Sequence, residues 1–320
     1  MCYLRNGSFY NKHQLLCGLR ILNPEGGQFK HDHREGWQID TPEIEDDLKI
    51  YLQDDLTYIG NKVMEIEKYI QHYGSDINRI TFYTWHRGIV KIYPGLNFKW
   101  YPLFLSDHRD NAILHREEIE KTFHFNDKTK KFLCLNARVR HHRDLVYGQI
   151  KNNPNCISSY THKGIMSPLP DDWTVKEYED WWIKDVDAVY LPNTKNLLHV
   201  SELYNNASFS LVTETRYELP FDFITEKTTQ CFLALHPALY VTTKGQVQIL
   251  REWGFDVFDD VFNHDYDYVD NDMRLGTLLK DNQHILEDGL VIDDQLKSRL
   301  IANRNHYFDK FGDVLDTKVA

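Results

Sequence analysis

Residues 209–241 read FSLVTETRYELPFDFITEKTTQCFLALHPALYV. The apolar run that opens this stretch predicts a buried strand over 209–213. The residues that follow predict a helix over 225–235 and a second strand over 238–242, with a proline separating them. A strand, a helix and another strand in this order are typical of a parallel α/β sheet.

Polar residues stand at both turning points of this stretch. Glu214 and Arg216 follow the first strand, where open α/β sheets bind ligands. Thr225 is placed as the N-cap of the helix, so Glu226 and Lys227 fall in its first turn. A carboxylate there is favoured by the helix dipole and can accept two hydrogen bonds from the vicinal hydroxyls of a ribose, while the ammonium can face a phosphate.

The same alternation extends in both directions through the second half of the chain. The predicted strands or extended pieces lie at 130–136, 157–160 and 188–191, and 256–259 is predicted to be a strand or a turn. The predicted helices lie at 137–150, 175–182, 247–253, 271–286 and 293–311. Strands that alternate with helices over this length favour a parallel, doubly wound sheet.

The first half is predicted to be a separate α/β domain. Thr41 and Pro42 begin a helix, a second helix is predicted over 60–73, and the apolar residues of 79–85 predict a strand. The composition changes over the charged segment 109–131, so we place an N-terminal domain at 1–125 and a C-terminal domain at 126–320. In this interpretation the last helix can cross back to the first domain.

Composition narrows the classes of function. The chain has 320 residues, 42% of them hydrophobic, and a net charge of -11. The length favours two domains, and the negative charge disfavours a general electrostatic grip on nucleic acid. Five scattered cysteines without a CxxC pair favour reduced thiols over a disulfide framework or a zinc site. A small-molecule or glycan substrate is expected.

The N-terminus lacks a basic region followed by an apolar core and a cleavage site, and no apolar run approaches the ~20 residues that span a bilayer. We therefore expect a cytoplasmic protein without a transmembrane segment.

A basic cluster follows the strand predicted at 130–136. Arg138, Arg140 and Arg143, with His141 and His142, stand where that strand leads into a helix. Free backbone N–H groups and the helix dipole favour an anion at this point, and a guanidinium matches two phosphate oxygens at once. The cluster therefore suits a diphosphate, with a solvated basic face as the alternative.

These motifs resemble one known family. The run 209–214, the block Asp222-Phe-Ile-Thr-Glu-Lys227, the apolar helix and Pro237-Ala-Leu-Tyr-Val241 are similar to the donor-binding motif of the α1,3-fucosyltransferases. Leu135-Asn136 followed by Arg143 is similar to the family's Ser-Asn turn and arginine. The resemblance covers about residues 130–245.

The resemblance implies a GT-B glycosyltransferase, with two Rossmann-like domains and a cleft between them. Such an enzyme is inverting and needs no metal or cofactor. By the resemblance, its donor is a nucleotide-diphosphate sugar of the GDP-fucose kind, and its acceptor is a glycan or another hydroxyl. The chain departs from the family pattern at Thr215-Arg216, which leaves the sugar and the base open.

The resemblance also implies roles for individual residues. Arg140 or Arg143, with Lys227, would neutralise the diphosphate, and Glu226 would hold the ribose. Glu214 would stand near the sugar or nucleotide and is a candidate catalytic residue. The donor-binding set is completed by Arg138, Arg216, Tyr217 and Thr225. The two polar strand ends must then converge on one diphosphate.

An inverting transfer also needs a base that takes the proton of the acceptor hydroxyl. We expect it in the N-terminal domain, and the candidates are His31, Asp32, His33, Glu35 and His86.

Three other functions stay open. The pairs Asp185/Asp187 and Asp265/Asp267 could form the metal clamp of a GT-A transferase. A GT-B enzyme that glycosylates a modified DNA base would need a local basic groove despite the net charge. A nucleotide-binding protein without turnover is the third.

Overall fold

The computed structural model describes residues 19–22, 48–52, 66, 70–71, 74–84, 93–100, 103–125, 128–129, 131–136, 140–162, 165–166, 197–218 and 223–319. The chain divides into two compact units. The first comprises Met1–Leu103 with Leu315–Ala320, and the second comprises Phe104–Val314.

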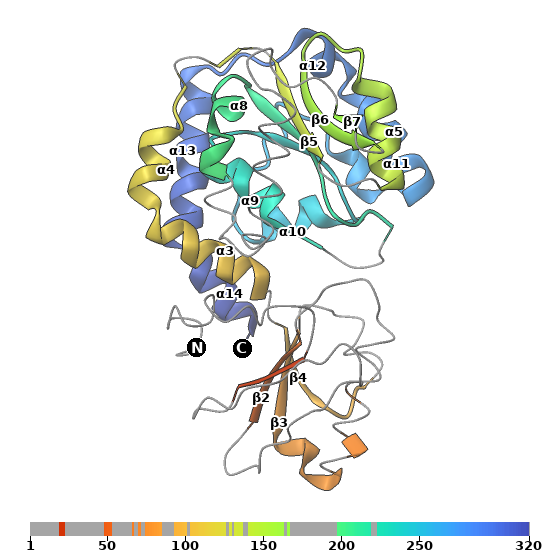
Figure 1. The fold of residues 1–320 in the computed structure, drawn as a ribbon, viewed down its shortest axis with the longest axis vertical. Helices are drawn as coiled ribbons and strands as arrows, with labels where there is room; N and C mark the ends of the chain where they lie inside the picture. The colour runs from red at the N-terminus through yellow and green to blue at the C-terminus, as the bar shows by residue number, and fades with distance from the viewer. Residues whose placement is uncertain are drawn as a thin grey trace. The chain divides into compact units, whose positions relative to one another are not determined.

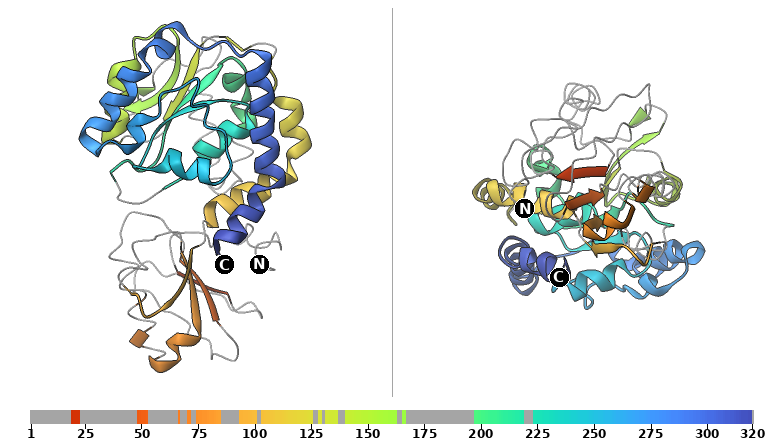
Figure 2. Two further views of the ribbon diagram at one scale, coloured as in Figure 1. Left: turned by 180° about the vertical axis from the view of Figure 1, so that it is seen from behind. Right: turned by 90° about the horizontal axis from the view of Figure 1, so that it is seen from below.

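The division falls at 103/104, whereas the charged segment suggested 125/126. The residues between these points form α3 (Leu103–Leu114) and α4 (Arg116–Thr122), which run beside α13 (Asp294–Asp309) (Figures 1 and 2). Arg109 Nη2 donates to the Phe308 carbonyl at 2.7 Å, and Arg116 pairs with Asp309 at 2.5 Å. The charged stretch is therefore the outer face of two helices of the second unit and not a linker.

The first unit contains a four-stranded sheet in the order β1-β2-β3-β4. Its strands are β1 (Leu19–Leu22), β2 (Leu48–Leu52), β3 (Ile80–Thr84) and β4 (Asn97–Trp100). The β1–β2 pair is antiparallel and the other pairs are parallel. A 3-10 helix, η2 (Gly74–Arg79), precedes β3, which confirms the strand predicted at 79–85. Residues 66, 70 and 71 of the helix predicted at 60–73 are helical; the helix predicted from Thr41 lies outside the described residues.

The second unit contains a five-stranded sheet in the order β7-β6-β5-β8-β9. Its strands are β5 (Phe132–Asn136), β6 (Cys156–His162), β7 (Ile165–Met166), β8 (Phe209–Thr213) and β9 (Ala238–Val241). All neighbouring pairs are parallel except β6–β7. Every residue of β8 and of β9, the last strand in this order, is buried, as expected for strands covered on both faces. The predicted α/β class with a parallel sheet is confirmed here.

The strand order creates a switch point between β5 and β8. From β5 the chain moves outward to β6 on one side, and it later returns to β8 on the other side of β5. The connections that leave β5 and β8 therefore diverge, and open α/β sheets bind ligands in the crevice between two such strand ends. The described residues that follow these two strand ends are Arg140 on the β5 side and 214–218 with 223–225 on the β8 side.

Helices complete the second unit (Figure 1). They are α5 (His141–Ile150), α8 (Ser201–Asn205), α9 (Glu226–Leu233), α10 (Gln246–Glu252), η3 (Asp265–Tyr268), α11 (Asn271–Asp281), α12 (Gln283–Asp288) and α13, and α14 (Phe311–Val319) runs past the end of the unit. No described helix is long and apolar enough to cross a membrane.

Four predicted elements differ in detail or cannot be compared. The helix predicted at 271–286 is interrupted at Asn282, whose side chain bonds the N–H and the carbonyl of Asn263 at 2.8 and 2.9 Å. Residues 256–259 contain no strand, and Phe258 has a left-handed φ of 63°. The elements predicted at 175–182 and 188–191 lie outside the described residues.

Candidate functional site at the ends of β5 and β8

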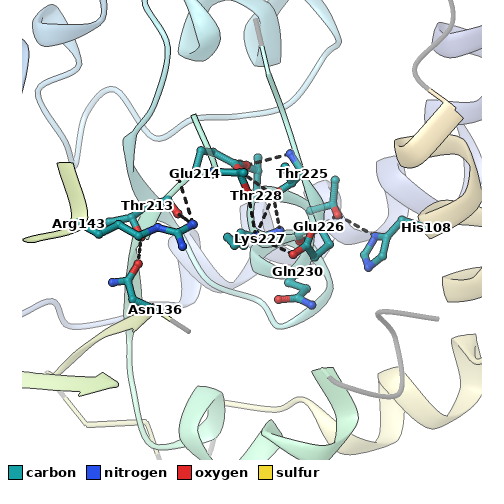
Figure 3. Close-up of polar contacts among 12 residues, drawn as sticks. His108, Asn136, Arg143, Thr213, Glu214, Thr225, Glu226, Lys227, Thr228 and Gln230 are labelled. Carbon is teal, nitrogen blue, oxygen red and sulfur yellow. Dashed lines mark hydrogen bonds and ion pairs between the residues drawn. The ribbon is translucent and has the colours of Figure 1, made fainter. Parts of the chain in front are cut away.

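The start of α5 is bonded to the end of β8. Arg140 is the extended residue before the helix, and the two residues after His141 turn inward. His142 Nε2 lies 2.9 Å from the Glu214 carbonyl oxygen. Arg143 Nη2 donates to the carbonyls of Thr213 and Glu214 at 3.1 and 3.2 Å (Figure 3). The end of β8 and the start of α5, which follows β5, are therefore joined by direct hydrogen bonds.

Burial determines the charge state of His142. Only 2% of the residue is exposed, and this burial lowers its pKa to about 4, so the ring is neutral at pH 7. A carbonyl oxygen can only accept, which means that Nε2 carries the hydrogen and donates it to Glu214. Burial also lowers the pKa of Arg143, although a guanidinium stays charged at neutral pH.

Glu214 joins β8 to α9. Its carboxylate accepts from the Thr225 N–H at 3.0 Å, the Thr225 hydroxyl at 2.5 Å, the Thr228 hydroxyl at 2.6 Å and the Thr215 N–H at 3.2 Å (Figure 3). Four donors match the four lone-pair positions of a carboxylate, and the residue is fully buried. The resemblance implied a place near the sugar or nucleotide for Glu214, but in this structure the carboxylate anchors the first turn of α9.

Glu226 and Lys227 form an ion pair at the start of α9. Thr225 is the N-cap, as predicted, and its hydroxyl accepts from the Lys227 N–H. Lys227 Nζ lies 2.7 Å from Glu226 Oε1 and 3.5 Å from the Thr215 hydroxyl. Burial disfavours the Glu226 charge, but the adjacent Lys227 ammonium outweighs it and holds the pKa of Glu226 below its ordinary value. The Glu226 carboxylate is therefore charged at neutral pH.

Tyr217 is a packing residue between α5 and α11. Its ring stacks on His142 at 5.5 Å, and the Arg274 guanidinium lies over the ring at 4.4 Å. Arg274 Nη2 donates to the Tyr217 carbonyl at 2.7 Å, and the Tyr217 hydroxyl donates to the Asn271 carbonyl at 2.9 Å. Tyr217 thus holds in place residues 214–218, the segment after β8 to which it belongs. Arg274 was not predicted, because it lies far along the chain and no motif marks it.

A polar pocket of about 200 Å³ lies between the two loops. Its lining comes from the start of α5 and from the residues after β8: Arg140, His141, His142, Thr215, Arg216 and Glu218. Arg140 and Arg216 belong to the predicted donor-binding set. Thr215 and Glu218 do not, although they flank Arg216 and could have been included as members of the same loop.

The other predicted residues fall into two groups. Glu226 and Lys227 do not line this pocket, and Lys227 reaches it only through Thr215. The rest lie outside the described residues: Arg138, His31, Asp32, His33, Glu35, His86, Asp185 and Asp187.

The pair Asp265/Asp267 does not have the arrangement of a metal clamp. Asp267 is fully buried, and its Oδ2 accepts from the Gln248 N–H at 3.0 Å, so it caps α10. Burial raises the pKa of Asp267, and the pair of carboxylates does not face one common site because Asp265 is exposed.

Chemically, the pocket combines two guanidinium groups with the N-terminus of α5, a combination that attracts anions. Comparisons of the chain with protein-family models, with curated proteins and with solved structures found no match.

Proposed function

We propose that the chain is an inverting, metal-independent glycosyltransferase of the GT-B type. It would move a sugar from a nucleotide-diphosphate sugar to a glycan or another hydroxyl acceptor. The observation that carries the proposal is the pocket at the switch point, where Arg140 and Arg216 come from the two diverging loops. The motif resemblance over 130–245 adds the reaction class.

The proposed chemistry follows from the charge that develops on the leaving group. Departure of a nucleoside diphosphate from the anomeric carbon builds negative charge, and fixed cations and N–H donors lower the barrier by stabilising it. Arg140, Arg216 and the first turn of α5 supply these groups in the proposal. Lys227 Nζ lies 3.5 Å from the Thr215 hydroxyl, next to the pocket, and is paired with Glu226.

The test is a thermal-shift and calorimetric panel of nucleoside diphosphates and nucleotide sugars, with and without EDTA. A ligand at 100 times its Kd stabilises the native state by about 2.7 kcal/mol. Arg140→Ala and Arg216→Ala should each weaken binding by about tenfold to a hundredfold, since hydrogen bonds to charged groups are worth about 1.5–3 kcal/mol.

Arg116→Ala is the matched control, because it removes the same charge from an arginine that is paired with Asp309 and does not line the pocket. It should bind nucleotides like the wild type. If no nucleotide raises the unfolding midpoint, the glycosyltransferase proposal is to be dropped; if EDTA abolishes turnover, its metal-independent form is wrong.

A further inference from the structure

The pocket holds less than a whole donor. Its volume of about 200 Å³ lies below the roughly 300–1,000 Å³ of typical small-molecule sites. A nucleotide sugar consists of a nucleoside, a diphosphate and a sugar, so the pocket can take one part of it together with the adjoining phosphate. The lining groups indicate which part.

Donors alone would suffice for a phosphate group, because a phosphate at neutral pH presents acceptor oxygens. Arg140 and Arg216 meet that need. The lining also contains acceptors, however, and acceptors beside a bare diphosphate would repel its oxygens. They require a ligand that carries hydrogen-bond donors next to its phosphate.

His142 is the first acceptor. Its Nε2 hydrogen is donated to the Glu214 carbonyl, so in the neutral ring Nδ1 keeps its lone pair. Tyr217 covers the face of the ring, which leaves the ring edge for contact with a ligand in the pocket that His142 lines. The burial that lowers the pKa of His142 to about 4 keeps this nitrogen unprotonated at pH 7.

Glu218 is the second acceptor. Its side chain is exposed and lines the pocket, and its backbone is held because its carbonyl accepts from Asn271 Nδ2 at 3.2 Å. A carboxylate can accept two hydrogen bonds from neighbouring hydroxyls. Because it lines the same pocket as the two arginines, it would weaken the binding of a plain anion.

We propose that this pocket takes the sugar 1-phosphate half of the donor, with the phosphate on Arg140 and Arg216 and the sugar hydroxyls on His142 Nδ1 and Glu218. Vicinal hydroxyls and a phosphate on one small ring match the mixture of acceptors and donors in the lining. The assignment rests on the proposed function for the identity of the donor, but the binding of a sugar phosphate can be measured without turnover.

The test compares four probes by calorimetry on the full chain: α-glucose 1-phosphate, β-fucose 1-phosphate, inorganic phosphate and pyrophosphate. At least one sugar 1-phosphate should bind about tenfold more tightly than inorganic phosphate. Glu218→Gln should weaken that binding by about tenfold and leave pyrophosphate binding equal or tighter, because the removed charge repels an anion. Glu117→Gln, an exposed carboxylate of α4, is the matched control and should change neither.

His142→Gln is the second variant. The Gln side-chain nitrogen reaches about as far as Nε2, so it can still donate to the Glu214 carbonyl, but no acceptor remains at the position of Nδ1. This variant should also lose about tenfold in sugar 1-phosphate affinity, with pyrophosphate affinity retained.

The outcomes separate the two proposals. Equal binding of inorganic phosphate and every sugar 1-phosphate by the wild type would overturn the assignment, and so would unchanged sugar 1-phosphate binding in both variants. Nucleoside diphosphate binding that depends on Arg140, without any sugar 1-phosphate binding, overturns the assignment alone and leaves the transferase proposal standing. Sugar 1-phosphate binding that depends on Glu218, without any nucleotide binding, supports the assignment and removes the nucleotide-sugar donor.

Discussion

Substitution of Glu214 by glutamine distinguishes a structural from a catalytic role for this carboxylate. In the structure each oxygen accepts one backbone N–H and one hydroxyl: Oε1 accepts from the Thr225 N–H and Thr228, and Oε2 from the Thr215 N–H and the Thr225 hydroxyl. An amide replaces one of these oxygens by an NH₂ group. A threonine hydroxyl can rotate and accept from it, but a backbone N–H cannot.

Whichever way the amide turns, one buried backbone N–H therefore loses its acceptor. An unsatisfied buried donor costs about 1–3 kcal/mol, and the remaining bonds lose the strength that the charge gave them. We expect Glu214→Gln to lower the free energy of unfolding by about 3 kcal/mol, which for a unit of this size corresponds to a fall of roughly 6–12 °C in Tm.

Calorimetry of the full chain measures this loss, and hydrogen exchange of peptides covering 209–233 localises it to the junction of β8 and α9. Glu117→Gln, with the same change of charge on an exposed helix face, should stay within about 0.5 kcal/mol of the wild type. The structural role of the Glu214 carboxylate is refuted if Glu214→Gln matches the wild type in stability. A variant of wild-type stability that lost only turnover would instead restore the catalytic role that the resemblance implied.

Two further predictions concern stability. His142 and His108 have pKa values lowered to about 4 by burial, and His108 Nδ1 lies within hydrogen-bond distance of Tyr307 and Thr229. Since the unfolded histidines bind protons near pH 6.5 and the folded ones do not, their stabilisation is complete above about pH 6.5 and declines toward pH 4, by about 2 kcal/mol per histidine at pH 5. Urea unfolding at pH 7 and pH 5 measures this loss of stability. If the loss between the two pH values is as large in His142→Gln as in the wild type, the prediction is contradicted. Arg274→Met should cost about 3 kcal/mol because it removes a buried guanidinium that bonds Tyr217 and Asn271. Arg116→Ala, at an exposed ion pair, should lower the free energy of unfolding by less than about 1 kcal/mol. If Arg274→Met and Arg116→Ala lose the same stability in thermal unfolding, burial of the guanidinium does not explain the predicted difference between them.

The sequence predicted the second unit well because its signals are local. The apolar runs around 132–136 and 209–213 and the Thr225 cap each depend on a few neighbouring residues, and the structure contains all of them. The strand order is not local, so the switch point between β5 and β8 could not be derived from the pattern. The division at 103/104 rather than 125/126 is also not local, because tertiary contacts such as those of Arg109 and Arg116 with α13 assign α3 and α4 to the second unit.

The residues predicted for the candidate site include both pocket-lining and loop-holding side chains. Residue type and position after a strand identified Arg140 and Arg216, which line the pocket. The same signals also selected Glu214 and Tyr217, whose side chains are occupied in holding the loop in place. A polar residue at a strand end is equally suited to touching a ligand and to fixing the backbone that touches it. The four donors that the Glu214 carboxylate already accepts from place it among the residues that fix the backbone.

The residues that hold the two loops in place bear on how rigidly the pocket's cations are positioned. Fixed dipoles and charges stabilise a developing anion because they need no rearrangement when the charge appears. The first turn of α9 is fixed by Glu214, and the loop that carries Arg216 is fixed by the packing of Tyr217 between His142 and Arg274. If the pocket binds the leaving phosphate, these buried groups determine how rigidly its cations are held. Substitutions at Arg274 should then weaken ligand binding without touching the ligand, and to a degree that follows the loss of order in residues 214–218.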